Sequence, residues 1–297
     1  MALHLSPARR RSREAAAALG IAVCIAGGCG VQRTIAVERI DNPTDAGGTS
    51  SDASIDMTAD GPGDADGASS PEEVSDGLDD LSCENPVFMT QDAGGIWNDA
   101  GADFYVFNNV YNTKDNPGAQ ELFACSYRRW FVVSEQMSDA GAVESYPNVQ
   151  MNFSPHLAVS SLQTITSSFV ETGPQVGAYE YAYDVWLNGV ASAGSTQVLV
   201  WVDTHDRVPD GSLVTTVTLS SGTYDVWMTD DSHIVLKSTV NFSAGTVNLL
   251  EIIKWTIGKG WVDSSSLLWQ IDFGIEIEST GGASATYHVD DFSLTVM

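Results

Sequence analysis

Apolar and polar residues alternate with a period of two through most of the chain beyond residue 83. The alternation is clear at Leu213, Thr215, Val217 and Leu219, and again at Ile234, Leu236, Ser238, Val240 and Phe242. Successive side chains of a strand point to opposite faces, so this period predicts half-buried β-strands, and the Gly, Asn, Asp and Pro residues between the runs predict turns. Many short strands are typical of a β-sandwich or jelly roll. We therefore expect an all-β jelly roll of two antiparallel sheets.

One segment breaks this period and predicts a single helix over residues 247–257. Its apolar residues recur at helical spacing at Val247, Leu250, Ile253 and Ile257. Gly258 and Gly260 follow as stop signals. Glu251 lies three residues after Asn248, a spacing that predicts a capping box rather than a catalytic role.

Composition divides the chain near residue 83. Residues 31–82 hold 13 of the 39 acidic residues, two arginines and no aromatic residue, whereas all eight Trp, nine Tyr and ten Phe follow. The first stretch lacks the apolar surface that would offset its ordering entropy, and its charges repel one another. We expect a disordered acidic linker over residues 29–82 and one folded domain over residues 83–297.

The N-terminus has the layout of a secretory signal, residues 1–28. Four arginines between residues 9 and 13 precede an apolar run over residues 15–28 that is too short to span a membrane. The run ends Ala-Gly-Gly-Cys29, which resembles the lipobox of bacterial lipoproteins. Cys29 is therefore the expected lipid anchor on the cell envelope, and ordinary cleavage with secretion is the alternative.

Charge and cysteine usage restrict the partners of the domain. The formal net charge is −26, and residues 83–297 alone hold 25 acidic against 7 basic residues. A nucleic-acid partner is excluded because phosphate binding needs a basic surface. Cys83 and Cys125 are an even pair in an exported domain, which predicts a disulfide. We expect no metal or cofactor, since the sequence has no G-x-S-x-G, H-E-x-x-H or phosphate-loop motif. The histidines, His205 and His233 included, are predicted to lie in turns or at the surface. We also expect a monomer.

Three predicted strands place acids and amides on the face opposite their apolar row. Over residues 180–186 these are Glu180, Asp184 and Trp186; over 197–203 they are Gln197, Leu199, Trp201 and Asp203; over 271–278 they are Asp272, Glu276 and Glu278. Carboxyl pairs flanked by aromatic rings suit sugar hydrolysis, in which one acid protonates the leaving oxygen. Solvated faces of ordinary strands also hold such residues.

Ordered motifs across residues 83–297 resemble the small cellulases of glycoside hydrolase family 12. Residues 143–149 (VESYPNV) resemble their VKSYPNV segment, and residues 105–111 (YVFNNVY) resemble a strand ending NNLW. Further on, the sequences YDVW, QVLVW and FGIE, which begin at residues 183, 197 and 273, resemble the YD, ELMIW and FGTE strands.

The resemblance implies a jelly roll that binds β-1,4-glucan in a concave cleft and a retaining mechanism with two carboxyls. It assigns Glu276 as general acid/base and Asp184 as the carboxyl that supports the nucleophile. Asn109 and Tyr111 would contact glucosyl units, Tyr111 replacing a stacking Trp, and Trp201 is a further candidate platform.

The chain departs from the family pattern at the nucleophile, where Gln197 replaces Glu. An amide has no anionic oxygen with which to form the glycosyl ester. Two hypotheses remain open: a glucan hydrolase that uses Glu276 with another group, Asp184 or Asp272, and a surface β-glucan-binding protein without turnover.

Overall fold

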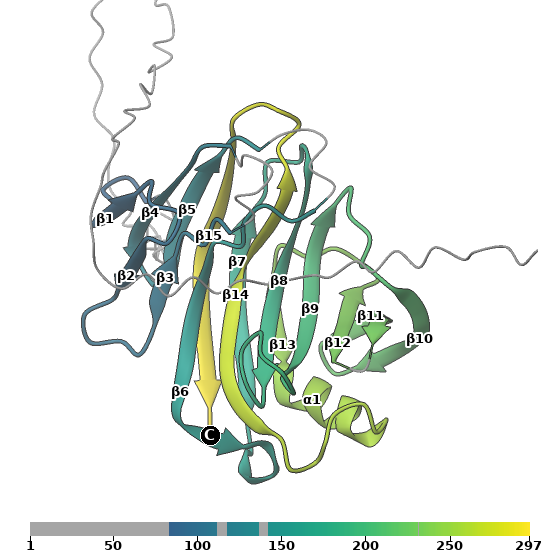
Figure 1. Ribbon diagram of the computed structural model, residues 1–297. Coiled ribbons are helices and arrows are strands. Elements are labelled where there is room, and N and C mark those ends of the chain that lie inside the picture. Colours follow the sequence, from purple (N-terminus) through teal and green to yellow (C-terminus); the bar gives the residue numbers. More distant parts are fainter. Residues whose placement is uncertain (1–82, 112–117, 137–141, 231) are drawn as a thin grey trace, which may run out of the picture. The chain divides into compact units, whose positions relative to one another are not determined.

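The computed structural model describes residues 83–111, 118–136, 142–230 and 232–297, which form two β-sheets and one α-helix (Figure 1). The six-stranded sheet has the order β1 (Phe88–Thr90), β4 (Gln120–Ser126), β5 (Arg129–Ser134), β15 (Ala285–Val296), β7 (Ile165–Thr172) and β13 (Ala244–Asn248). The nine-stranded sheet has the order β10 (Ser212–Leu219), β11 (Gly222–Asp230), β12 (His233–Ser238), β9 (Thr196–His205), β8 (Ala178–Leu187), β14 (Leu267–Ser279), β6 (Asn148–Ala158), β3 (Tyr105–Phe107) and β2 (Ile96–Asn98). The predicted all-β architecture is confirmed.

The core lies between the two sheets and takes one row of side chains from each long strand. On β8 this row includes Tyr181, Tyr183 and Val185, and on β14 it runs from Ile271 to Ile277. The opposite face of the nine-stranded sheet has a second, small apolar cluster of Ala182, Leu199, Trp201 and Val235. The division of faces predicted from alternation is therefore confirmed for these strands.

The single predicted helix is α1 (Leu249–Gly258), with Asn248 as its N-cap. The Asn248 side chain accepts a hydrogen bond from the backbone N–H of Glu251 at 3.1 Å. The Glu251 carboxylate accepts from the backbone N–H of Ser220 (3.1 Å) and from its hydroxyl. The expected cap is confirmed on the Asn248 side, and the glutamate instead joins the helix to the loop after β10.

Three positions differ from the alternation: Leu213, Asp203 and Val240. Leu213 lies at a β-bulge of β10, where it pairs with Trp227 while Thr215 pairs with Val226, so it faces away from the side of Thr215 and is 51% exposed. Val202 and Asp203 lie at a β-bulge, where Tyr181 pairs with Asp203 and Ala182 with Trp201. The extra residue turns Asp203 to the side of Tyr181, which faces the core, so its expected place beside Trp201 was wrong. Val240 lies beyond the end of β12 and is 71% exposed.

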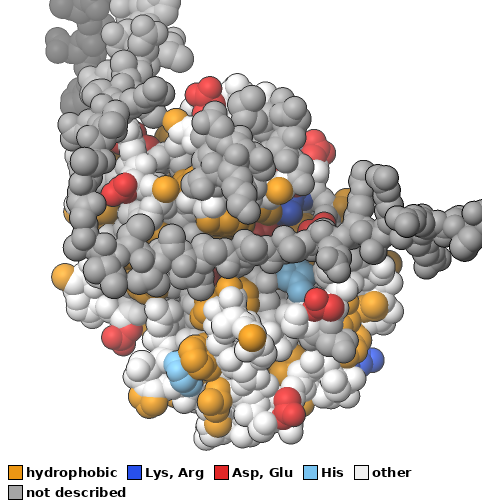
Figure 2. All heavy atoms as spheres, viewed as in Figure 1, with side chains coloured by type: hydrophobic (Ala, Val, Ile, Leu, Met, Phe, Trp, Pro, Cys, Tyr) orange, Lys and Arg blue, Asp and Glu red, His pale blue; other side chains and the backbone are white. Residues whose placement is uncertain are grey.

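The Cys83–Cys125 disulfide is present and joins the start of the domain to β4. The expected signal (1–28), linker (29–82) and anchor Cys29 lie outside the described residues and stay predictions. No helix among the described residues is long and apolar enough to cross a membrane. On the face shown in Figure 2, Lys and Arg side chains are scarce, in keeping with the acidic composition.

Candidate active site

The structure brings the predicted catalytic positions together on one face of the nine-stranded sheet. We call this the polar face, defined by Glu180 and Asp184 on β8, Gln197 on β9, and Asp272 and Glu276 on β14. On β14 and β8, Asp272 lies directly opposite Asp184, and Glu276 directly opposite Glu180. The two strands therefore place two carboxyl pairs on the polar face, four residues apart.

Gln197, at the expected nucleophile position, is hydrogen-bonded at both ends of its amide. Its Nε2 donates to Oδ2 of Asp184 at 2.8 Å, and its Oε1 lies 2.9 Å from Nδ1 of His233. The amide nitrogen facing Asp184 sets the orientation, so Oε1 accepts from the Nδ1–H of His233. The side chain is thus neutral, held in place and without the anionic oxygen that attack on a sugar requires.

Asp184 and Asp272 form the first carboxyl pair and are 4% and 3% exposed. Gln270 Nε2 donates to both oxygens of Asp272, at 2.8 and 3.0 Å. Burial raises the pKa of both carboxyls well above the usual range, and the Asp184 charge adds to the rise at Asp272. The buried environment therefore disfavours the charged form of each carboxyl.

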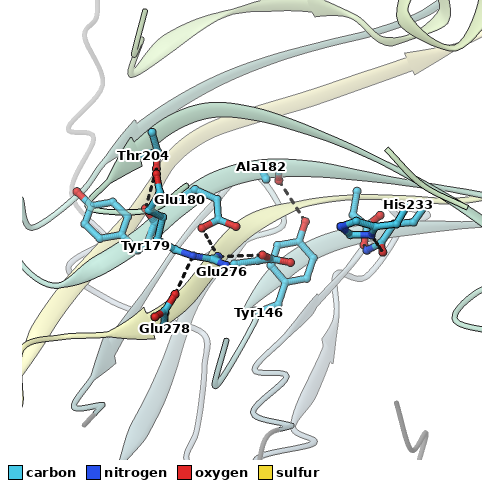
Figure 3. Close-up of polar contacts among 11 residues, drawn as sticks. Tyr146, Tyr179, Glu180, Ala182, Thr204, His233, Glu276 and Glu278 are labelled. Atoms are coloured by element: carbon cyan, nitrogen blue, oxygen red, sulfur yellow. Dashed lines mark hydrogen bonds and ion pairs between the residues drawn. The ribbon is translucent and has the colours of Figure 1, made fainter. Parts of the chain in front are cut away.

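The second carboxyl pair, Glu180 and Glu276, lies against Arg207 from the loop after β9. Arg207 Nη1 forms a short ion pair with Oε2 of Glu180 and lies 3.1 Å from Oε2 of Glu276. Its Nε lies 3.1 Å from Oε2 of Glu278. Figure 3 shows the three glutamates converging, with Tyr146 beside Glu276. One guanidinium thus serves three carboxyls, the expected acid/base among them.

The predicted sugar-binding residues lie at the same site but differ in exposure. Trp201 is 3% exposed, and the guanidinium of Arg207 lies over its ring, 5.2 Å from the centroid. Tyr111 is 42% exposed, yet its pKa is raised well above its usual value, first by burial of the hydroxyl end and then by the charge of Glu276. Asn109 Nδ2 donates to the backbone oxygen of Tyr146 at 3.1 Å. Tyr111 thus offers the exposed ring, and the sugar contacts of all three stay predictions.

Sequence reasoning missed three residues of this site. Arg207 had no assigned role, Glu180 was placed on the face without a partner, and His233 was expected at the surface rather than bound to Gln197. His233 and Gln197 are Cα partners in the parallel pairing of β12 and β9. No local motif signals these contacts, because each depends on strand register or on the path of a loop.

Comparison with known proteins agrees with the motifs. The model of glycosyl hydrolase family 12 matches residues 102–297. No curated protein matches the chain. Among solved structures, the xyloglucanase domain of NopAA, a type three effector from Sinorhizobium fredii, solved with cellobiose, is 23% identical with a TM-score of 0.62, covering 71% of this chain and 100% of that one.

Two further structures give the same fold at lower identity. Endoglucanase Cel12A from Rhodothermus marinus is 21% identical with a TM-score of 0.62, covering 71% of this chain and 99% of that one. The family 12 xyloglucanase from Bacillus licheniformis is 18% identical with a TM-score of 0.62, covering 71% and 100%. The family match spans most of the described domain, and the chain belongs to glycosyl hydrolase family 12.

Proposed function

We propose that the polar face binds a β-1,4-glucan and that the retaining hydrolysis typical of two-carboxyl glycosidases does not run there. The observation that supports this proposal is the state of Gln197, a neutral amide held between Asp184 and His233. A retaining enzyme needs a carboxylate at this place, because the first step forms an ester with the anomeric carbon. An amide in the same place still offers hydrogen bonds to a sugar.

Glucan is the favoured ligand class because the chain belongs to a family whose solved members include endoglucanases and xyloglucanases, one of them in complex with cellobiose. The polar face adds the chemistry that such a ligand needs: an exposed aromatic ring at Tyr111 and several carboxyl and amide groups. The protein's acidic charge favours a neutral polysaccharide over an anionic one.

A second candidate, hydrolysis through another base, has one observation in its favour. Asp184 and Asp272 lie on the same face as Glu276, and inversion needs only a base that activates water opposite an acid. Against it, both carboxyls are almost fully buried, 4% and 3% exposed, and both accept hydrogen bonds from amide donors, which leaves little access for an attacking water. Binding without turnover is therefore the function that the site supports best.

Affinity electrophoresis of the full-length protein in gels containing barley β-glucan or xyloglucan tests binding. We expect retarded migration, and Tyr111→Ala weakens binding about tenfold, or about 1.4 kcal/mol, because it removes the exposed ring of the face. Val87→Ala, which removes an exposed apolar side chain next to the other sheet, leaves the retardation unchanged. Equal migration with and without polysaccharide would contradict the proposal.

A further inference from the structure

Arg207 covers the ring of Trp201, the second aromatic ring that the sequence predicts as a sugar platform. Its guanidinium lies over the ring, 5.2 Å from the centroid, and the Arg207 side chain is itself only 9% exposed. The ring also packs in the small apolar cluster with Ala182, Leu199 and Val235. Trp201 is therefore enclosed by protein, in agreement with its exposure of 3%.

The contacts of Arg207 hold it over this ring. The guanidinium forms a short ion pair with Glu180 and lies 3.1 Å from an oxygen of both Glu276 and Glu278. Its backbone oxygen accepts a hydrogen bond from Nζ of Lys237 at 3.2 Å, which ties the loop to β12. A guanidinium suits such a place because it is planar, stacks on an aromatic face and donates in fixed directions at the same time. A ligand that needed the ring would have to displace a cation held by three carboxyls.

Trp201 and Tyr111 lie on opposite sides of Glu276. Trp201 is on β9, which is separated from β14 by β8. Tyr111 is joined to the other side of β14, because its backbone N–H donates to the oxygen of Glu144 (3.2 Å), whose own N–H donates to the oxygen of Ile277 (2.8 Å). The two predicted platforms therefore flank the position expected to act as the acid/base.

Only one of the two flanking rings is accessible to a ligand. Tyr111 is 42% exposed and Trp201 is 3% exposed. A sugar can stack on an aromatic side chain only where the face of the ring is free. A glycosidic bond joins two sugar units, so a carboxyl aimed at the bond oxygen has one unit on either side of it. The guanidinium occupies the stacking position on one of these sides.

We propose that Arg207 is a specificity-determining residue that fills the stacking position over Trp201 and confines glucan binding to the Tyr111 side of Glu276. The inference rests on the proposed function, since it takes β-1,4-glucan as the ligand of the polar face. It is independent of Gln197, because it concerns which sugar units the protein holds and not the chemistry at the anomeric carbon.

Titration calorimetry of the full-length protein with cellohexaose tests this closure. The opened variant combines Arg207→Ala with Glu180→Gln, so that the fully buried glutamate is not left without its cation. We expect the opened variant to bind cellohexaose about tenfold more tightly than the wild type, because a second ring becomes free to stack on a glucosyl unit. Adding Trp201→Leu, which keeps an apolar side chain in the cluster, removes this gain.

The matched control is Arg128→Ala with Asp291→Asn. It also removes one arginine and one carboxylate, but from an exposed ion pair of the six-stranded sheet. The net charge therefore changes as in the opened variant, and we expect the affinity for cellohexaose to stay at the wild-type value.

Arg207→Lys separates coverage of the ring from charge. Lysine keeps a cation among the three carboxyls, so this variant decides the question even if the opened variant fails to fold. Its compact ammonium has no plane to lay over the ring. We expect a gain in cellohexaose affinity that is smaller than that of the opened variant, about threefold. An affinity equal to that of the wild type would show that only the charge of Arg207 matters and would overturn the inference.

The outcomes distinguish the inference from the proposed function. A wild type that binds cellohexaose, with no gain in the opened variant or with a gain that survives Trp201→Leu, would overturn the role of Arg207 and leave the glucan site standing. Binding by the opened variant alone would support the closure and contradict glucan binding by the wild type. The absence of binding heat for every protein would overturn both.

Discussion

The two carboxyl pairs of the polar face lie on the same two strands and are neutralised in different ways. Asp184 and Asp272 are partnered by the amides of Gln197 and Gln270, whereas Glu180 and Glu276 are partnered by the guanidinium of Arg207. Like charges directly opposite each other on adjacent strands are destabilising, so each pair needs hydrogen-bond donors or a counter-charge that reduces the repulsion. The amide donors bring no charge to the first pair, whereas the guanidinium brings one positive charge to the second.

The difference shows why retained carboxyls do not by themselves indicate a working glycosidase. A retaining site needs one ionised and one protonated carboxyl at the two sides of the scissile bond. Here the position expected to be ionised, residue 197, is an amide, and the position expected to be protonated, Glu276, contacts a cation. Neither position therefore matches the surroundings that its half of the reaction requires.

The largest expected effect comes from removing the cation. Arg207→Met leaves Glu180 and Glu276 facing each other without a counter-charge, and we expect the free energy of unfolding to fall by about 3–5 kcal/mol. Urea denaturation monitored by tryptophan fluorescence measures it. Arg128→Met, at an ion pair whose side chains are 51% and 37% exposed, costs about 0–1 kcal/mol. An equal loss in the free energy of unfolding for Arg207→Met and Arg128→Met would contradict the difference expected between the buried and the exposed arginine.

A smaller effect is expected at the amide-partnered pair. Gln270→Leu removes both hydrogen bonds to Asp272 and leaves a buried carboxyl without these donors, so the free energy of unfolding falls by about 1–3 kcal/mol. The same denaturation experiment applies. Gln163→Leu is the matched control, because Gln163 is exposed and its hydrogen bond to Met297 is donated by its backbone N–H. A loss at Gln270 as large as that at Arg207 would show that amides and cation are equivalent here.

A pH-dependent effect is expected at a carboxyl between the sheets, Glu171 on β7. Burial, followed by the charge of the displaced Asp203, raises its pKa from 4.5 to about 9; Asp290 adds to the rise and the nearby Tyr181 hydroxyl opposes it. The folded state therefore holds a proton that the unfolded state has lost. Stability from this group is complete below about pH 4.5 and is lost as the pH rises towards 9.

Glu171→Gln removes that titration. We expect the wild type to lose stability with rising pH relative to the variant by at most about 1.4 kcal/mol per pH unit. Thermal unfolding at pH 5, 7 and 8 measures the divergence. Glu84→Gln, at an exposed glutamate, follows the wild type. Parallel curves for Glu171→Gln and the wild type would refute the assignment.

Alternation along the sequence was sufficient to predict the two faces of β8 and β14 and hence the shared face of Asp184 and Glu276. The helix and its Asn248 cap were equally predictable, because both depend on contacts a few residues apart. The displacement of Asp203 was not, since a bulge of one residue leaves no signal in an otherwise regular run of valines.

The electrostatic contacts of the site could not be predicted from the sequence for a related reason. Arg207 follows β9 in an irregular loop, directly after Asp206, whose φ is 51°. Its contacts with Glu180 and Glu276 depend on that path and on the register of two strands. The sequence around Arg207 gave no indication of which carboxyls this arginine would contact.

Titration calorimetry of the full-length wild type with cellohexaose, followed by chromatography of the recovered sugar, tests the central claim most directly. The account predicts saturable binding heat and intact cellohexaose at the end of the titration. Recovery of shorter cello-oligosaccharides would contradict it by showing turnover despite Gln197 and Arg207, and the absence of binding heat would contradict it by removing glucan as the ligand.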